Sequence, residues 1–156
     1  MARKVLIAED NKFTAMQYKK FLEANGYKVT VFNDGANCLE KYGNELRYRR
    51  VVLKDRSAPY DHVLLDHDMP KMSGAEVSKK IHKQCPEQKI IFLSAYGQSI
   101  LKSHESSKEG FLQIIQKPFS LEFLLKKIEP KSFTSVKRTN QENSVMTSTQ
   151  SPETIR

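Results

Sequence analysis

Residues 4–10 of the chain read KVLIAED. Apolar side chains run from position 5 to position 8 without the alternation of a half-buried strand, and the acidic pair Glu9-Asp10 follows directly. A strand that is covered on both faces has this pattern, and such strands occur mainly in parallel sheets. The stretch therefore predicts the first strand of a parallel sheet, with two carboxylates at its carboxyl end.

Four further runs of this kind lie downstream, and segments with helical spacing separate them. Together the predicted strands are residues 4–8, 28–32, 62–66, 89–93 and 112–115. The predicted helices run from Phe13 to a cap at Asn25-Gly26 and over residues 36–48, 74–84, 98–108 and 121–128. Alternation of strands and helices predicts right-handed crossovers. The predicted fold class is therefore α/β: a doubly wound, five-stranded parallel sheet with helices on both faces.

Length and composition predict one domain. The chain has 156 residues and 38% apolar content, which is enough for one core of ordinary size. After residue 130 the composition changes to Ser, Thr, Asn and Gln, so we expect a domain over residues 1–130 and a disordered tail over residues 131–156. A tail that becomes ordered on a partner, or a cut before a missing output domain, is the alternative.

Hydropathy and cysteine usage indicate the cellular context. No stretch approaches the roughly 18 apolar residues of a membrane-spanning helix, and the first residues lack the apolar core of a signal peptide. We therefore expect a cytoplasmic protein with no membrane partner. Cys38 and Cys85 form no CxxC pair, which favours buried thiols over a disulfide or a cysteine metal site.

Basic residues concentrate in an extended segment at about residues 41–58. The chain carries a formal net charge of +8, and this segment holds six basic residues against two acidic ones. A solvated face and a docking surface are both compatible with the cluster. A nucleic acid is a less favoured partner, because no aromatic or helix-turn-helix pattern accompanies the charges.

Polar residues interrupt the apolar pattern where the predicted strands end. Glu9 and Asp10 end the first strand, Asp66 ends the third, Ser94 the fourth and Lys117 the fifth. Because the carboxyl ends of parallel strands share one edge of the sheet, these side chains should converge on one pocket.

Carboxylates crowded into one pocket repel one another unless a cation lies between them. Mg²⁺ takes oxygen ligands of this kind, so we expect it to bind Glu9, Asp10 and Asp66, with the backbone carbonyl of Asp68 as a further ligand. The ion would leave Asp66 able to act as a nucleophile and form an aspartyl phosphate.

The remaining residues of the pocket suit a phosphate group. Lys117 supplies a compact positive charge, and the Ser94 hydroxyl can donate a hydrogen bond to a phosphate oxygen. Asp68 and Tyr96 are expected to border the pocket and to tune dephosphorylation by positioning or excluding water. His67 is expected to be a surface side chain.

The order of these motifs resembles the response-regulator receiver family of two-component signalling over residues 3–129. The matching motifs are Glu9-Asp10, DHDMPKMSG at 66–74, LSA at 93–95 and KPF at 117–119. The resemblance implies a flavodoxin-like sheet with strand order 2-1-3-4-5 and a cis peptide bond before Pro118. It also implies that Asp66 takes a phosphoryl group from a histidine kinase or phosphotransfer protein with Mg²⁺ bound. Such a receiver is not an enzyme in the usual sense, because it catalyses only its own phosphorylation and dephosphorylation.

Two regions depart from the family pattern. Ile114 stands three positions before the lysine, where members usually have an aromatic residue whose inward rotation reports phosphorylation. The segment from Gly35 to Asp66 is longer than usual, so an extended second helix or loop should project there. With no output domain in the sequence, the chain resembles single-domain, chemotaxis-type receivers that dock on a downstream protein. We expect a monomer or weak dimer.

Two other functions remain open. Residues 64–68 also resemble the motif of haloacid-dehalogenase-type phosphatases, in which Asp66 would be the nucleophile. That family, however, carries the motif on its first strand and an acidic motif after its lysine, and neither is found here. The other alternative is a receiver-fold binding module that works without phosphorylation, which Ile114 favours.

Overall fold

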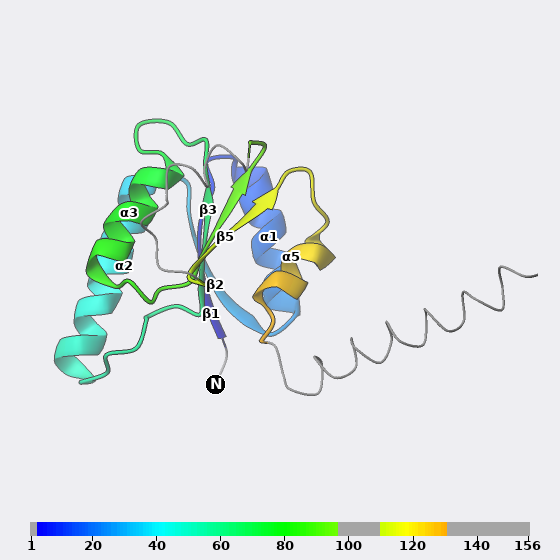
Figure 1. Cartoon of the computed structure of the whole chain (residues 1–156). Helices are drawn as coiled ribbons and strands as arrows, with labels where there is room; N and C mark the ends of the chain where they lie inside the picture. Colours follow the sequence, from blue (N-terminus) through cyan, green and yellow to red (C-terminus); the bar gives the residue numbers. More distant parts are fainter. Residues whose placement is uncertain (1–2, 97–109, 131–156) are drawn as a thin grey trace, which may run out of the picture. The chain divides into compact units, whose positions relative to one another are not determined.

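Five parallel strands form one sheet within the part of the chain that this computed structural model describes, residues 3–96 and 110–130. The strands are β1 (Arg3–Ala8), β2 (Tyr27–Phe32), β3 (His62–Asp66), β4 (Ile90–Ser94) and β5 (Leu112–Gln116). They lie in the order β2-β1-β3-β4-β5, and each neighbouring pair is parallel (Figure 1). The predicted strand order 2-1-3-4-5 is confirmed.

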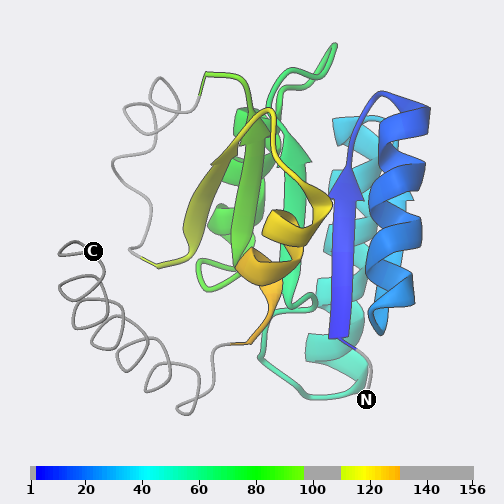
Figure 2. The same cartoon turned by 90° about the vertical axis from the view of Figure 1, so that its right-hand side faces the viewer.

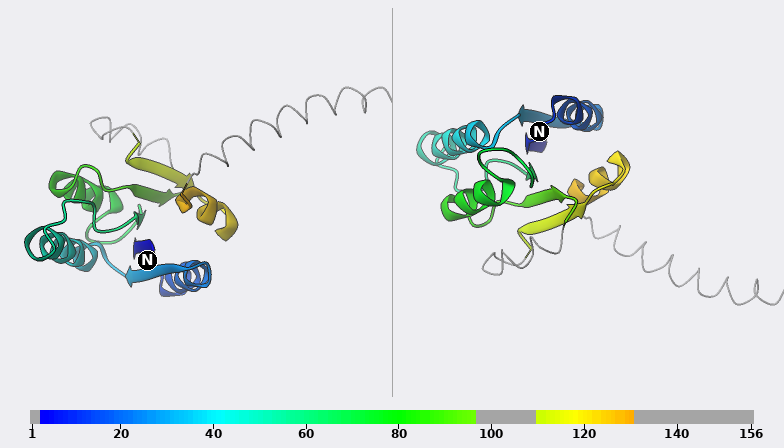
Figure 3. Two further views of the ribbon diagram at one scale, coloured as in Figure 1. Left: turned by 90° about the horizontal axis from the view of Figure 1, so that it is seen from below. Right: turned by 90° about the horizontal axis from the view of Figure 1, so that it is seen from above.

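Helices cover both faces of the sheet. α1 (Lys12–Ala24) lies on one face, and α2 (Gly35–Arg47) and α3 (Gly74–Gln84) lie on the other (Figure 1, Figure 2). Viewed along the strands, the sheet is the middle of three layers (Figure 3). Within the described segments, no helix has both the length and the apolar character needed to span a membrane. The predicted doubly wound α/β fold is confirmed.

Side-chain caps start these three helices. The side chains of Asn11, Asp34 and Ser73 each accept a hydrogen bond from the backbone N–H three residues later. Such caps satisfy donors that the first helical turn leaves unpaired. Asn11 and Asp34 follow β1 and β2 closely, so the chain turns from strand to helix at the carboxyl edge of the sheet.

The apolar core between the sheet and the pair α2 and α3 contains both cysteines. Leu6, Leu65 and Phe92 of three neighbouring strands are fully buried there. Cys38 of α2 and Cys85 are buried in the same cluster, and both are free thiols. Cys85 directly follows the last residue of α3. The prediction of buried thiols is confirmed.

α2 continues into a π-helix, η1 (Tyr48–Val52), in the region where the sequence predicts an extended helix or loop. The 13 residues of α2 span about 20 Å, which is about the length of a strand of six residues. The helical run therefore extends past the amino end of the strands. Buried Gln88 holds the return to β3: its Nε2 donates to the Tyr60 carbonyl at 2.8 Å, and its Oε1 accepts from the Tyr42 hydroxyl at 3.0 Å.

The chain divides into two compact units within α5 (Leu121–Ile128). The first unit is residues 1–125 and contains the sheet with α1, α2 and α3. The second unit is residues 126–156, of which those up to Pro130 are described. The helix predicted at 98–108 and the tail predicted after Pro130 lie outside the described residues.

Candidate functional site

The carboxyl edge of the sheet, at the top of Figure 1, brings the predicted site residues together. In the β1–β3 register Ala8 lies opposite Leu65. The residues that follow them, Glu9 and Asp66, therefore lie next to each other at this edge. The Glu9 N–H donates to the Phe32 carbonyl of β2 at 3.0 Å, which continues the strand pairing one residue beyond β1. The backbone itself therefore positions the first carboxylate.

Glu9, Asp10 and Asp66 form a cluster of three carboxylates. One oxygen of each lies within 4.8 Å of the others. Glu9 is 2% exposed and Asp66 is 4% exposed, whereas Asp10 is open to solvent. Such a set of oxygen atoms, partly buried and reachable from one side, is suited to a hard divalent cation.

The Lys117 ammonium faces two of these carboxylates. Its Nζ lies 3.3 Å from Asp66 Oδ1 and 3.7 Å from Glu9 Oε1. The Lys117 N–H donates to the Ser94 carbonyl at 2.8 Å, and the peptide bond to Pro118 is cis, as the resemblance implies. One ammonium against three carboxylates leaves an excess of negative charge in this cluster.

The excess of negative charge affects the acidity of Glu9. Burial, followed by the hydrogen bond with Asp66 and the charge of Asp66, raises the pKa of Glu9 from 4.5 to about 8. A divalent cation beside these oxygens would favour the ionised carboxylate and oppose this shift. The chemistry of the donor set therefore fits Mg²⁺.

Ser94 ends β4 in a fully buried position. Its Oγ accepts a hydrogen bond from the Tyr96 N–H at 3.0 Å. Its neighbour Leu93 pairs with Asp66 in the β3–β4 register, so Ser94 lies at the predicted edge. Tyr96 is 71% exposed.

The loop that follows β3 folds back on Asp66. The Asp68 N–H donates to Asp66 Oδ1 at 3.3 Å, and the Gly74 N–H donates to the His67 carbonyl at 3.2 Å. A Cβ atom at Gly74 would lie 2.5 Å from the Asp66 carbonyl oxygen, so only glycine fits there. The Asp68 side chain is 62% exposed and lies beside the His67 ring, with 3.2 Å between Oδ1 and Nδ1.

His67 and Ile114 are both associated with Phe92 of β4. The His67 ring meets the Phe92 ring edge-on with 6.0 Å between their centroids, and Ile114 lies opposite Phe92 in the β4–β5 register. The His67 side chain is 27% exposed, and the aromatic ring of the neighbouring strand covers part of it. Ile114 packs against the apolar core.

Two further residues lie at this edge that the sequence alone does not identify, because they belong to none of the motifs at the strand ends. The Asn33 side-chain amide donates to the Glu9 carbonyl at 3.0 Å; its only sequence signal is its position directly after β2. Tyr18 of α1 is buried and stacks on Phe119, with 6.0 Å between ring centroids. Burial, with the charges of Glu9 and Asp66, raises the pKa of Tyr18. The sequence shows Tyr18 only as a core position of an amphipathic helix, and this does not indicate that it lies near the carboxylates.

Comparison with known proteins identifies the family. A family model described as the response regulator receiver domain matches residues 5–129. The chemotaxis protein CheY of Thermotoga maritima is 34% identical over 119 residues, which are 76% of this chain and 88% of that protein. The response regulator receiver protein CpdR of Brucella abortus is 28% identical over 127 residues, which are 81% of this chain and 94% of that protein. The chain belongs to the response-regulator receiver family.

Solved structures share the fold. The receiver domain of a sensor histidine kinase from Pseudomonas aeruginosa PAO1 matches with a TM-score of 0.64 and 21% identity, over 82% of this chain and 95% of that one. In that protein a magnesium ion is coordinated in the active site cleft. The match covers most of both chains, so the two proteins share the same fold.

Proposed function

We propose that Asp66 accepts a phosphoryl group and that its phosphorylation switches a docking surface of this receiver. The observation that carries the proposal is the convergence of Glu9, Asp10 and Asp66 at one sheet edge, with Lys117 Nζ 3.3 Å from Asp66 Oδ1. An acidic pair or a lone lysine alone has ordinary structural explanations, whereas their convergence at the strand ends of this fold is typical of a ligand site. We also propose that the protein works in the cytoplasm and that it is a monomer or a weak dimer.

Glu9, Asp10 and Asp66 are the side chains that would hold Mg²⁺, with the Asp68 carbonyl as a further ligand. When bound, the ion would neutralise charge on the carboxylates and on the phosphoryl group. The clustered oxygens support this assignment from the chain itself. The magnesium ion in the Pseudomonas aeruginosa receiver domain supports it by analogy.

The phosphoryl donor is a phosphohistidine of a histidine kinase or of a phosphotransfer protein. A carboxylate oxygen of Asp66 attacks phosphorus, a P–O bond forms and the P–N bond to the donor histidine breaks. The histidine nitrogen keeps the electron pair and takes up a proton. Water later cleaves the acyl phosphate and restores the Asp66 carboxylate with release of inorganic phosphate. The protein therefore catalyses only its own modification.

Lys117 and Ser94 bind the phosphoryl oxygens in this proposal. The Lys117 ammonium already faces Asp66 Oδ1 and can pair with charge on the phosphoryl group. The Ser94 Oγ acts as acceptor toward the Tyr96 N–H, which leaves its own proton for a phosphoryl oxygen. Movement of Ser94 toward that oxygen would pull on the Tyr96 backbone and so couple the site to the segment after β4.

Ile114 cannot act as the rotating aromatic reporter of the family pattern. Its side chain is aliphatic and packs against the apolar core. The proposed switch therefore uses the hydrogen bond between Ser94 and Tyr96. A receiver-fold binding module that works without phosphorylation is the second candidate, because Ile114 occupies the reporter position.

The test is labelling with acetyl phosphate and Mg²⁺. Wild type should take up one phosphoryl group per chain, and Asp66→Ala should take up none. Asp61→Asn is the matched control, because Asp61 lies at the amino end of β3 and accepts a hydrogen bond from the Lys4 N–H there. Equal labelling of wild type and Asp66→Ala would refute the proposal. A folded wild type that binds Mg²⁺ without any labelling would favour the binding module, and repeated turnover of a phosphate ester would favour a phosphatase.

A further inference from the structure

The segment of residues 48–56, which we call the η1 tip, exposes a cluster of apolar side chains. Tyr48, Val51, Val52 and Leu53 are 52%, 64%, 60% and 53% exposed. They are four of the eight large apolar side chains that are exposed among the described residues. π-helical turns are rare and often occur at functional sites, and contiguous apolar surface marks interaction sites. The η1 tip is therefore a candidate binding surface that phosphorylation of Asp66 does not explain.

Basic residues flank and interrupt this apolar cluster along the chain. Those in the η1 tip or next to it are Arg47, Arg49, Arg50, Lys54 and Arg56. The one carboxylate in the η1 tip, that of Asp55, is paired with Arg49. Lys54 and Arg56 form no ion pair with any described residue, and both are exposed. Two cations are thus available to a partner.

The spacing of the apolar residues suits insertion of a helix into a groove. Tyr48 and Val52 stand four residues apart in η1, and a π-helical turn is slightly longer than four residues, so these two exposed side chains lie on the same side of the helix. Apolar side chains on one side of a helix serve as anchors in helix-in-groove complexes. The helix is also fixed to the rest of the fold, because Arg50 Nη2 donates to the Gln84 carbonyl at 2.9 Å. A helix that is already ordered loses little conformational freedom on binding.

We propose that the η1 tip docks into an apolar groove that is rimmed by carboxylates on a partner protein. The apolar face would fill the groove, and Lys54 and Arg56 would pair with the rim. A nucleic acid is disfavoured because its surface presents charged phosphates to a tip whose centre is apolar. A membrane is disfavoured because binding strength scales with the buried apolar area, which four side chains keep small.

A hollow of about 450 Å³ beside η1 adds to the case for a protein partner. Arg49 of η1 lines it together with Arg3, Pro59 and Asp61. Arg3 and Asp61 are 3.5 Å apart with side chains 49% and 39% exposed, so this weak pair leaves Arg3 accessible to a carboxylate. A protein surface can fill a hollow beside a projecting tip, whereas a flat lipid surface cannot.

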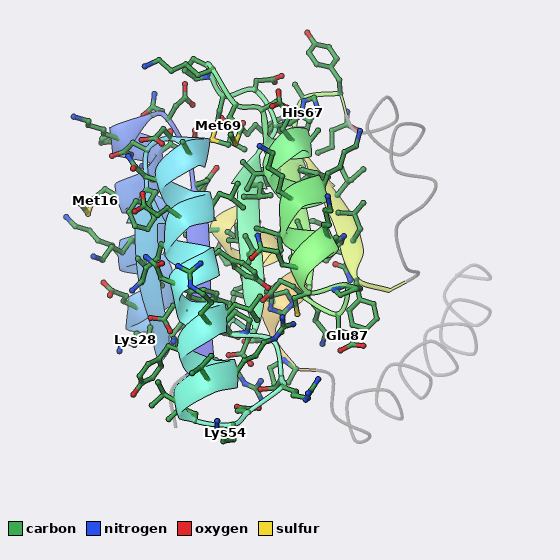
Figure 4. All side chains as sticks on the ribbon, turned by 90° about the vertical axis from the view of Figure 1, so that its left-hand side faces the viewer. Met16, Lys28, Lys54, His67, Met69 and Glu87 are labelled. Atoms are coloured by element: carbon green, nitrogen blue, oxygen red, sulfur yellow. The ribbon has the colours of Figure 1, made fainter. Side chains whose placement is uncertain are left out.

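The η1 tip lies away from the carboxylate cluster. Figure 4 shows Lys54 at one end of the face formed by α2 and α3, and His67 and Met69, in the loop after Asp66, at the other end. A protein on the η1 tip therefore leaves Asp66 open to a phosphoryl donor. Docking would hold the receiver on one partner through repeated cycles of phosphorylation. The affinity of the η1 tip for that partner would not depend on whether Asp66 is phosphorylated.

The experiment starts with a photoreactive benzoylphenylalanine in place of Leu53 in the full chain. The same residue in place of Phe13, which is 73% exposed on α1, is the positional control. After irradiation in an extract of the source cells, the protein crosslinked only through position 53 is identified, purified and titrated with wild type, Val52→Asp and the double variant Lys54→Glu/Arg56→Glu. Vesicles of anionic phospholipid and a random-sequence DNA duplex are titrated in parallel. Thermal unfolding verifies that each variant is folded.

The proposal predicts a specific adduct with one protein and an affinity that falls at least tenfold in both variants. The affinity should also weaken as salt rises, because charged contacts at the rim are screened. A partner that binds both variants as tightly as wild type, or no adduct specific to position 53, would overturn it. Binding of vesicles or DNA that Val52→Asp abolishes would overturn it as well, in favour of that other surface.

Discussion

The two ends of the parallel sheet differ in how their side chains are assembled. At the carboxyl edge, Glu9, Asp66 and Lys117 come from separate strand ends and meet within hydrogen-bonding or ion-pairing distance. At the amino end, the η1 tip is one continuous segment whose large apolar side chains are exposed. The first region exists only when the whole sheet is formed, whereas the second needs little more than the end of one helix.

This difference separates the region that carries the family's motifs from a region that carries none of them. The carboxyl edge carries the strand-end residues of the receiver pattern, and its two buried acids leave little freedom for change. The η1 tip belongs to the segment that we expect to be longer than is usual in the family, and its large apolar side chains are exposed. Perturbations should therefore have large effects at the first region and small effects at the second.

The largest effect is expected from a pair of glycine substitutions. Gly74→Ala should lower the free energy of unfolding by about 3 kcal/mol, because the new Cβ would meet backbone atoms of Asp66 that cannot move aside. Gly43→Ala, on α2, should raise it by roughly 0.5–1 kcal/mol, because its Cβ would meet only the flexible end of Gln84 at 3.7 Å. Urea unfolding measures both. Equal effects of the two substitutions would contradict the account of the β3 loop.

The second-largest effect is expected when the Lys117 ammonium is removed. Lys117→Met should slow phosphorylation by acetyl phosphate about 10²-fold, because one preorganised charge that faces the phosphoryl group is removed. Lys28→Met, at the start of β2, is the control and should leave the rate unchanged. The rate of label uptake at saturating Mg²⁺ is the measurement. A Lys117→Met rate within threefold of wild type would mean that the contact with Asp66 has only a structural role.

The stability of the carboxyl edge should depend on pH through Glu9. Because burial raises the pKa of Glu9 to about 8, the folded chain holds a proton that the unfolded chain releases, so stability falls as pH rises toward 8. Burial of part of the His62 ring lowers the pKa of His62 from 6.5 to about 4, and this group acts in the opposite direction below pH 6.5. The useful window therefore lies between pH 6.5 and 8. In that window wild type without divalent cations should lose several degrees of melting temperature.

Two comparisons isolate this contribution. Glu9→Gln should flatten the decline between pH 6.5 and 8. Mg²⁺ should restore wild type most strongly at the upper end, because the ion binds the ionised carboxylate and the ionised share of Glu9 rises toward pH 8. Thermal unfolding in EDTA and in Mg²⁺ measures both. The same decline in Glu9→Gln as in wild type would show that another group is responsible.

The smallest effect is expected at the η1 tip. Val52→Asp should change the free energy of unfolding by less than about 0.5 kcal/mol, because the side chain is 60% exposed. The rate of phosphorylation should be unchanged, because the η1 tip lies away from Asp66. Urea unfolding and label uptake measure the two quantities. A clear loss in either would mean that the two ends of the sheet are coupled.

The fold and the strand-end residues could be predicted from the sequence because both depend on local patterns. The runs at β1 and β3 are apolar without alternation, and the polar residues that end them mark one edge whatever the details of packing. The ends of some strands differ from the prediction by one residue, as in β4, which runs over Ile90–Ser94 where the sequence predicts 89–93. Local propensity does not resolve such differences.

Contacts between distant side chains could not be predicted in this way. The half-buried state of His67 depends on the Phe92 ring of the next strand, and the hydrogen bond from Asn33 to the Glu9 carbonyl depends on how β2 pairs with β1. The extension of α2 could be expected from the length of the segment, but its π-helical form and its exposed apolar face required the structure.

The central claim is that Asp66, and neither of its two acidic neighbours, carries the phosphoryl group. Treatment of the acetyl phosphate-labelled protein with borohydride reduces an acyl phosphate to an alcohol, which marks the acceptor within the sequence. Peptide mass spectrometry should then find homoserine at position 66 alone, in wild type and in Val52→Asp to the same extent. Reduction at Glu9 or Asp10, or no reduced residue in a protein that has taken up label, would contradict the account.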